Sequence, residues 1–178
     1  MPSACIMRPS RVLLRTRCNA TTVAIATART ARLCVEITAP NGTRFSCDLV
    51  GRKAGIEDGM ITKEDLDRGD NMANIPAGEV YVVPDPKSGE GTIVFDRPVA
   101  YLGRWIKGIT LAFDNGRLNK WGAAENEDLI RADWEKAKGD RDRLGLIDIG
   151  LNPNAKTGFL QDVIVAGNVY IAVGDNDE

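Results

Sequence analysis

Apolar and polar residues alternate with a period of two over residues 33–50. The apolar positions in this stretch are Leu33, Val35, Ile37, Phe45, Cys47 and Leu49. Such alternation is typical of a strand with one buried and one solvated face, and the Pro-Asn-Gly sequence at residues 40–42 is typical of a turn. The pattern therefore predicts a β-hairpin over residues 33–50.

A second hairpin is predicted over residues 109–121, because Asn115-Gly116 separates two apolar stretches and both residues tolerate a positive φ. Apolar runs of strand length predict further strands over residues 79–83, 92–95, 146–149 and 168–173.

Helical patterns occur twice. Ile130, Trp134 and Ala137 share one helical stripe, acidic residues precede them and Gly139 follows, so one long helix is predicted over residues 125–138. Residues 51–72 are polar, acidic and glycine-containing, and only a short helix over residues 62–67 is predicted there. Thr62 would cap it, with Asp65 three residues later.

These elements predict an α+β fold: a mostly antiparallel β domain with one long helix, whose hairpins either close into a barrel-like form or stay open. The chain has 178 residues, of which 43% are hydrophobic, enough for one core. We expect a basic N-terminal segment at residues 1–32 and a single β-rich domain at residues 33–178.

The N-terminal segment carries six arginines before the first acidic residue, Glu36. Arginine, serine and threonine without acidic residues are typical of an organelle transit peptide. Two other interpretations stay open: a basic helix packed on the domain, or a start codon assigned too far upstream. We expect no clean strand before about Arg29, and a peripheral position for that part of the chain.

A net charge of −2 gives no general attraction to nucleic acid or to anionic lipid, and no apolar stretch is long enough for a membrane span. The four cysteines, at positions 5, 18, 34 and 47, include no Cys-x-x-Cys pair, so they predict reduced thiols rather than a zinc site. A cytoplasmic location is expected, with an organelle as the alternative.

The sequence contains no histidine. Its absence excludes an imidazole base, a Ser-His-Asp or Cys-His catalytic set, and an imidazole metal ligand within this chain. Glu79 lies between a Pro/Gly turn and an apolar strand, where a carboxylate can accept backbone hydrogen bonds, pair with an arginine or bind a metal.

Several segments occur in an order and spacing that resemble one family. They are residues 39–43, Gly51-Arg52, Asp58-Gly59, Asn74-Ile75-Pro76-Ala77-Gly78-Glu79-Val80, residues 91–93, 108–111 and 114–116, and the tail segments 150–156 and 170–176. From about residue 35 to residue 176 the chain resembles the C-terminal half of the thermophilic metallo-aminopeptidases, the family that includes aminopeptidase T and archaeal leucyl-type aminopeptidases.

This resemblance implies a hydrolase with two divalent metals, zinc or cobalt, that removes N-terminal residues such as leucine from peptides. It implies a peptide substrate and, as one option, a homodimer. It also assigns Glu79 to the position of a metal-binding glutamate in the family's Pro-x-Gly-Glu-Val segment.

Other ligand positions depart from the family pattern. Leu146 stands where the resemblance implies a glutamate, and Tyr170 where it implies a histidine. A family tyrosine falls at about Asp177, and the family's last ligands, a histidine and an aspartate, would lie beyond Glu178.

We therefore expect an incomplete or inactive member in which metal binding is weak or absent. The alternative is a non-catalytic β-rich interaction or oligomerisation domain. A related aromatic-ring dioxygenase lineage shares the fold, but its iron site also uses histidines.

Overall fold

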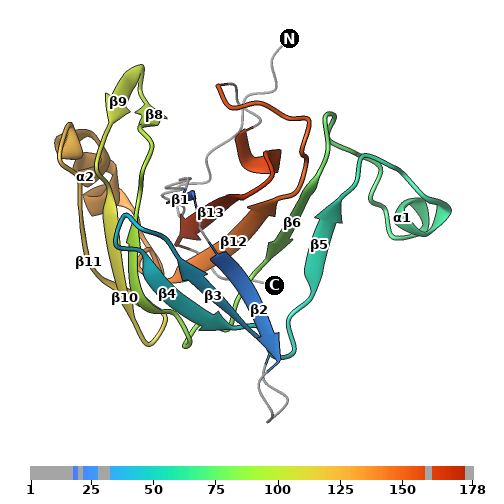
Figure 1. Ribbon diagram of the computed structural model, residues 1–178, viewed down its shortest axis with the longest axis horizontal. Helices are drawn as coiled ribbons and strands as arrows, with labels where there is room; N and C mark the ends of the chain where they lie inside the picture. The colour runs from blue at the N-terminus through green and yellow to red at the C-terminus, as the bar shows by residue number, and fades with distance from the viewer. Residues whose placement is uncertain (1–17, 20–21, 28–32, 159–161, 175–178) are drawn as a thin grey trace.

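The computed structural model describes residues 18–19, 22–27, 33–158 and 162–174, and Figure 1 shows their arrangement. Two antiparallel sheets and a short two-stranded ribbon make up the fold, so the expected α+β, β-rich class is confirmed. The described strands do not close into a barrel, and the barrel-like option is wrong.

The five-stranded sheet has the order β1-β13-β12-β6-β5. Its strands are β1 (Cys18–Asn19), β5 (Ala54–Glu57), β6 (Glu79–Val82), β12 (Leu144–Gly150) and β13 (Asn168–Val173). The 3-10 turn η1 (Asp162–Ile164) contacts β12 and β13.

The six-stranded sheet has the order β11-β10-β7-β4-β3-β2. Its strands are β2 (Thr22–Thr27), β3 (Leu33–Thr38), β4 (Arg44–Asp48), β7 (Glu90–Val94), β10 (Thr110–Asp114) and β11 (Arg117–Gly122). Strands β8 (Val99–Tyr101) and β9 (Arg104–Ile106) form the separate ribbon.

Both predicted hairpins are confirmed. In the first, β3 pairs with β4 so that Val35 lies opposite Cys47, and both side chains are buried. Its turn is held by Thr43, whose Oγ1 accepts from the Val94 amide at 3.0 Å. In the second, β10 pairs with β11, and Asn115 and Gly116 adopt φ values of 50° and 75°.

Both predicted helices are confirmed as well. The long one is α2 (Glu127–Lys136), which buries Ile130 and Trp134. The short one is α1 (Lys63–Asp67), and the Thr62 and Asp65 side chains form the complete capping box at its start. α1 buries no residue, so its capping, rather than core packing, defines it.

Three parts of the structure were not predicted. β5 lies within the segment for which only a short helix was expected, and the β8–β9 ribbon was missed. The expectation of no clean strand before Arg29 is wrong, because β2 pairs with β3 over six positions, although it does lie at a sheet edge. Residues 1–17 lie outside the described residues, as do Asp177 and Glu178.

One cluster of buried apolar side chains unites the two sheets and α2. From the six-stranded sheet it includes Val35, Phe45 and Leu111, and from the five-stranded sheet Ile147 and Ile171, with Trp134 contributed by α2. Trp134 packs on Trp121 of β11, with ring centroids 5.6 Å apart. The two sheets and α2 therefore share one hydrophobic core.

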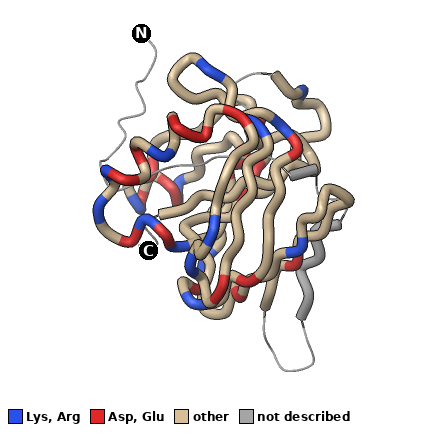
Figure 2. Tube along the Cα trace, turned by 90° about the vertical axis from the view of Figure 1, so that its left-hand side faces the viewer, with Lys and Arg blue, Asp and Glu red and all other residues tan. Residues whose placement is uncertain are grey.

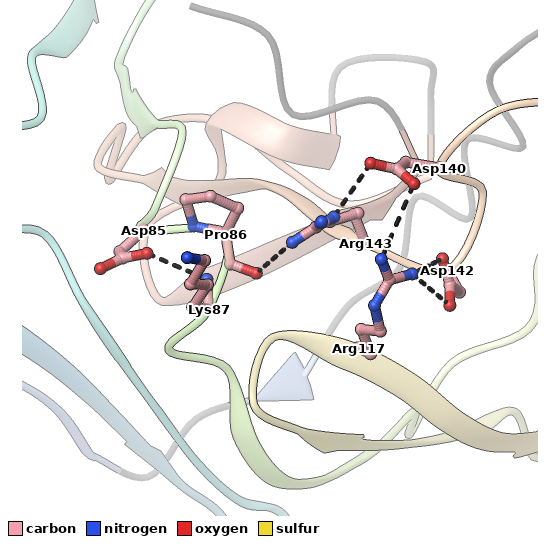
Figure 3. A network of polar contacts seen from close by, with 7 residues as sticks. All are labelled: Asp85, Pro86, Lys87, Arg117, Asp140, Asp142 and Arg143. Carbon is pink, nitrogen blue, oxygen red and sulfur yellow. Dashed lines mark hydrogen bonds and ion pairs between the residues drawn. The ribbon is translucent and has the colours of Figure 1, made fainter.

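A polar network ties loops of both sheets together (Figure 3). Arg143 donates to the Pro86 carbonyl at 3.1 Å and to Asp140 at 3.1 Å, and Arg117 binds Asp142 through 2.7 and 2.8 Å bonds. Elsewhere basic and acidic residues are interspersed along the chain (Figure 2). None of the helices in the described ranges combines the length and apolar character that spanning a membrane requires.

Candidate functional site

The five-stranded sheet has one apolar and one polar face. Val82, Ile147 and Ile171 are paired across β6, β12 and β13, and they point into the shared core. Because side chains alternate along a strand, the neighbouring row points to the other face. That row consists of Gly55, Tyr81, Asp148 and Tyr170.

Glu79, the predicted metal ligand, begins β6 on this polar face, two residues before Tyr81. Its partners in register are Glu57 on β5 and Gly150 on β12. The residue is half-buried, and its Oε2 atom is buried. The Gly78 amide before it donates to the Glu57 carbonyl at 2.8 Å, which fixes the entry to the strand.

Tyr81 is at the centre of the polar face. Its ring lies against Gly55, where an added Cβ would come within 2.1 Å of the ring, so a larger residue there would displace the ring from its present position. Burial raises the pKa of the Tyr81 phenol, and the negative charges of Glu57, Asp70, Glu79 and Asp148 raise it further. The face is therefore strongly acidic around this ring.

Asp148 is a buried carboxylate, only 7% exposed, between Tyr81 and Tyr170 in register. Sequence reasoning missed both Tyr81 and Asp148, because Asp148 lies inside an apolar run that was interpreted only as a buried strand. The available signal was the single acidic residue within Leu146–Ile149, since a buried carboxylate in a strand demands a polar environment.

The structure brings Leu146 and Tyr170 together. Both lie on the polar face, and with Asp148 and Val163 they line a cavity of about 20 Å³. Gly150, farther along β12, lies under the η1 segment, because an added Cβ there would come within 2.4 Å of the Val163 carbonyl. The two positions at which the family resemblance implies metal ligands are therefore neighbours, but Glu79 belongs to the adjacent row.

The donors on this face are carboxylate and phenol oxygens. A hydrolytic zinc or cobalt centre needs about three protein ligands for each metal, usually with imidazole among them, and the chain has no histidine. Within the described ranges, no cluster of three or more His, Cys, Asp or Glu side chains is placed to hold a metal ion. These residues do not fit a dinuclear zinc or cobalt centre.

A comparison with protein families matches residues 42–153 to the thermophilic metalloprotease (M29) family. The chain belongs to this family. The match includes Glu79 and Leu146 and ends before Tyr170.

Two aminopeptidases are similar in sequence to this M29 chain. Aminopeptidase AmpS of Bacillus subtilis is 35% identical over 60 residues, which are 34% of this chain and 15% of that protein. Aminopeptidase T of Thermus aquaticus is 32% identical over 89 residues, which are 49% of this chain and 22% of that protein. The chain thus spans about a fifth of the length of the curated relatives it matches.

Two solved structures share the fold. AmpT from Thermus thermophilus has a TM-score of 0.55 at 23% identity, covering 68% of this chain and 29% of that one. The 2,5-dihydroxypyridine dioxygenase from Pseudomonas putida KT2440 also has a TM-score of 0.55, at 17% identity, covering 79% of this chain and 49% of that one. The M29 fold of this chain therefore occurs in a peptidase and in an oxygenase, so fold alone does not assign an activity.

Proposed function

We propose that this chain is a catalytically incomplete member of the thermophilic metalloprotease family, which carries part of an aminopeptidase site but does not hydrolyse peptides by itself. One observation carries the proposal. Leu146 and Tyr170, at the two positions where the family resemblance implies a glutamate and a histidine, line one cavity on the polar face.

The chemistry of these two side chains opposes a dinuclear centre. Leucine has no lone pair to donate, and a neutral phenol is a poor replacement for imidazole as a zinc ligand. Two metal ions in a hydrolytic centre lie about 3.5–4 Å apart and need anionic ligands that bridge and surround them. Glu79 supplies one such carboxylate and Asp148 lies in the next row, which is too few donors for both ions.

Glu79 is the residue that we propose as a ligand for a single, weakly held divalent cation. Glu57 stands directly opposite Glu79 in the sheet, and like charges in that position repel each other. A cation between them would relieve the repulsion, and oxygen donors suit calcium or magnesium better than zinc or cobalt.

The finer expectations stay predictions from the family resemblance. They are zinc or cobalt as the metal of complete relatives, peptides with an N-terminal leucine as their substrates, a homodimeric assembly and a cytoplasmic location. For this chain each of them rests on that resemblance alone.

The direct test is hydrolysis of a leucyl anilide with added zinc or cobalt. We expect no metal-dependent turnover from the wild-type chain, from Glu79→Ala, or from the control Glu36→Ala, an exposed strand glutamate of the other sheet. Loss of Glu79 should change the free energy of unfolding by about 1–3 kcal/mol or less, as for one hydrogen-bonded carboxylate. Metal-dependent turnover that Glu79→Ala abolishes and Glu36→Ala retains would contradict the proposal.

A complementary test restores the family side chains in the double variant Leu146→Glu, Tyr170→His. We expect this variant to bind zinc at least tenfold more tightly than the wild type, because it gains a carboxylate and an imidazole on the face that carries Glu79. Zinc affinity equal to that of the wild type would show that these two positions do not define the incomplete site.

A non-catalytic interaction domain is the second candidate function. The observation that favours it is a long exposed segment, residues 50–78, which contains no buried residue. This candidate is compatible with the first, because a chain that has lost catalysis can retain a binding surface.

A further inference from the structure

Residues 50–81 form an exposed segment in which no residue is buried. The segment nevertheless contains large apolar side chains. Ile56, Met60, Leu66 and Met72 are 69%, 64%, 56% and 81% exposed, respectively. Clustered exposed apolar side chains in a folded domain mark a surface for another protein segment. Figure 1 shows α1 and its flanking loops projecting beyond β5.

A cleft of about 490 Å³ lies between β5 and α1. Its apolar walls include Ile56, Met60, Met72 and Tyr81. Its charged lining consists of five acidic residues, Glu57, Asp58, Glu64, Asp65 and Asp70, and a single basic residue, Arg68. Arg68 already pairs with Asp65. The cleft is therefore both apolar and acidic.

The wall formed by α1 is preorganised. The Thr62 amide donates to Asp65 at 2.8 Å, and the Asp65 amide donates to Thr62 at 3.2 Å, which completes the capping box. On the opposite side, β5 is fixed by its pairing with β6. A ligand therefore meets a surface whose backbone is already ordered, which lowers the entropic cost of binding.

The occupant that this surface fits is a basic segment with apolar side chains. Residues 1–17 have this chemistry: four arginines, no acidic residue, and the apolar side chains of Ile6, Met7, Val12, Leu13 and Leu14. Four positive charges complement the excess of four acidic residues that line the cleft. Arginine suits this role because its guanidinium binds carboxylates through two parallel hydrogen bonds.

The chain is long enough for the contact. The described part begins with β1, at the edge of the five-stranded sheet opposite β5. Four steps between neighbouring strands span about 19 Å at roughly 4.8 Å each. Seventeen extended residues reach up to about 56 Å. A segment of this length is therefore long enough to span the distance to the cleft within the same molecule.

We propose that the basic N-terminal segment, residues 1–17, docks intramolecularly in the acidic cleft between β5 and α1. Its arginines neutralise the carboxylates of the cleft, and its apolar side chains cover Ile56, Met60 and Met72. The proposal does not rest on the metal-binding assignment of Glu79, because Glu79 does not line the cleft; of the two opposed carboxylates only Glu57 does.

The test places the photoreactive residue benzoylphenylalanine at Met60 of the full-length chain, and at the control position Leu102, which is 73% exposed in the β8–β9 ribbon. Equal amounts of ¹⁵N-labelled and unlabelled chain are mixed before irradiation, and the products are mapped by mass spectrometry. We expect crosslinks from position 60 to residues 1–17 of the same chain, and none of these from position 102.

Replacing the four arginines of the segment with serine, or adding 1 M salt, should reduce the crosslinks at least tenfold, because the Debye length falls to about 3 Å. A second probe at Ile56 keeps the test valid if the Met60 variant fails to fold. Crosslinks between labelled and unlabelled chains, crosslinks only to other segments, or none from either probe would overturn the proposal.

Discussion

Strands β12 and β13 and the segment at residues 50–81 are connected within the same sheet, yet they differ in almost every physical respect. β12 and β13 bury most of their side chains, including Leu144, Ile147 and Ile171. Residues 50–81 bury none, although β5 and β6 extend the sheet that β12 and β13 begin. One part of the sheet is core, and the other is surface.

This difference assigns stability to the buried strands and ligand binding to the exposed segment. Fully burying an apolar side chain stabilises a fold by about 1.5–3 kcal/mol, and the strands at the centre of the sheet contain many such side chains. The exposed segment adds little to the free energy of folding, so its apolar and acidic residues are available for a ligand. The polar face spans both parts, because Tyr81 belongs to the exposed segment and Asp148 and Tyr170 belong to β12 and β13.

The largest predicted effect is on the free energy of unfolding, and it tests the difference between the buried strands and the exposed segment directly. Ile147→Ala should lower the free energy of unfolding by about 2–5 kcal/mol, because Ile147 is completely buried and its loss leaves a cavity. The matched change Ile56→Ala, at a residue 69% exposed, should stay within about 0.5 kcal/mol. Urea unfolding measures both. Equal losses for the two variants would show that the exposed segment belongs to the core.

The next effect concerns the network of Figure 3. Arg143→Ala removes the charged hydrogen bonds to the Pro86 carbonyl and to Asp140 from a side chain that is only 21% exposed. We expect a loss of about 1–2 kcal/mol. Its counterpart in the exposed segment, Lys63→Ala, breaks a solvated pair with Asp67 and should cost less than about 0.5 kcal/mol. If urea unfolding showed a larger loss of unfolding free energy for Lys63→Ala than for Arg143→Ala, this prediction would be contradicted.

The smallest effect is a dependence on alkaline pH. Burial raises the pKa of the Cys47 thiol to about 12 from 9.0, with Asp48 and Cys34 adding to the shift. The folded state therefore holds this proton more tightly than the unfolded state does. The stability that it contributes is complete below pH 9 and is lost as the pH rises from 9 to 12.

Between pH 8 and pH 10 the loss should be about 1 kcal/mol. Cys47→Val removes the titrating thiol, so its urea midpoint should fall less over this interval than that of the wild type. Above pH 10 the phenol of Tyr101, whose pKa is raised to about 12 by burial and by its hydrogen bond to Asp133, adds a loss of the same sign. Identical pH profiles of stability below pH 10 for wild type and Cys47→Val would contradict the assignment of this loss to the Cys47 thiol.

Alternation and turn chemistry predicted much of the fold from the sequence. The β3–β4 and β10–β11 hairpins follow from period-two patterns on either side of Asn-Gly sequences, because each pattern needs one buried face and a turn with positive φ. β5 escaped prediction for a tertiary reason. Gly55 is a poor strand former, but the Tyr81 ring on the neighbouring strand fills the space above it.

The candidate site was only partly predictable. The family resemblance pointed to Glu79, Leu146 and Tyr170, and the cavity that joins Leu146 with Tyr170 is a product of register between distant strands. Asp148 and Tyr81 could not be recognised as neighbours, because their proximity depends on β6 pairing with β12 across 67 residues. Register of this kind is set by the core face of the sheet and not by the polar residues themselves.

The metal content of the purified chain tests the central claim most directly. The chain is incubated with excess zinc or cobalt, desalted and measured by elemental analysis. A catalytically incomplete site predicts far less than one metal ion per chain, with Glu79→Ala indistinguishable from wild type after desalting. Two tightly retained ions per chain, as a dinuclear hydrolytic centre requires, would contradict the account.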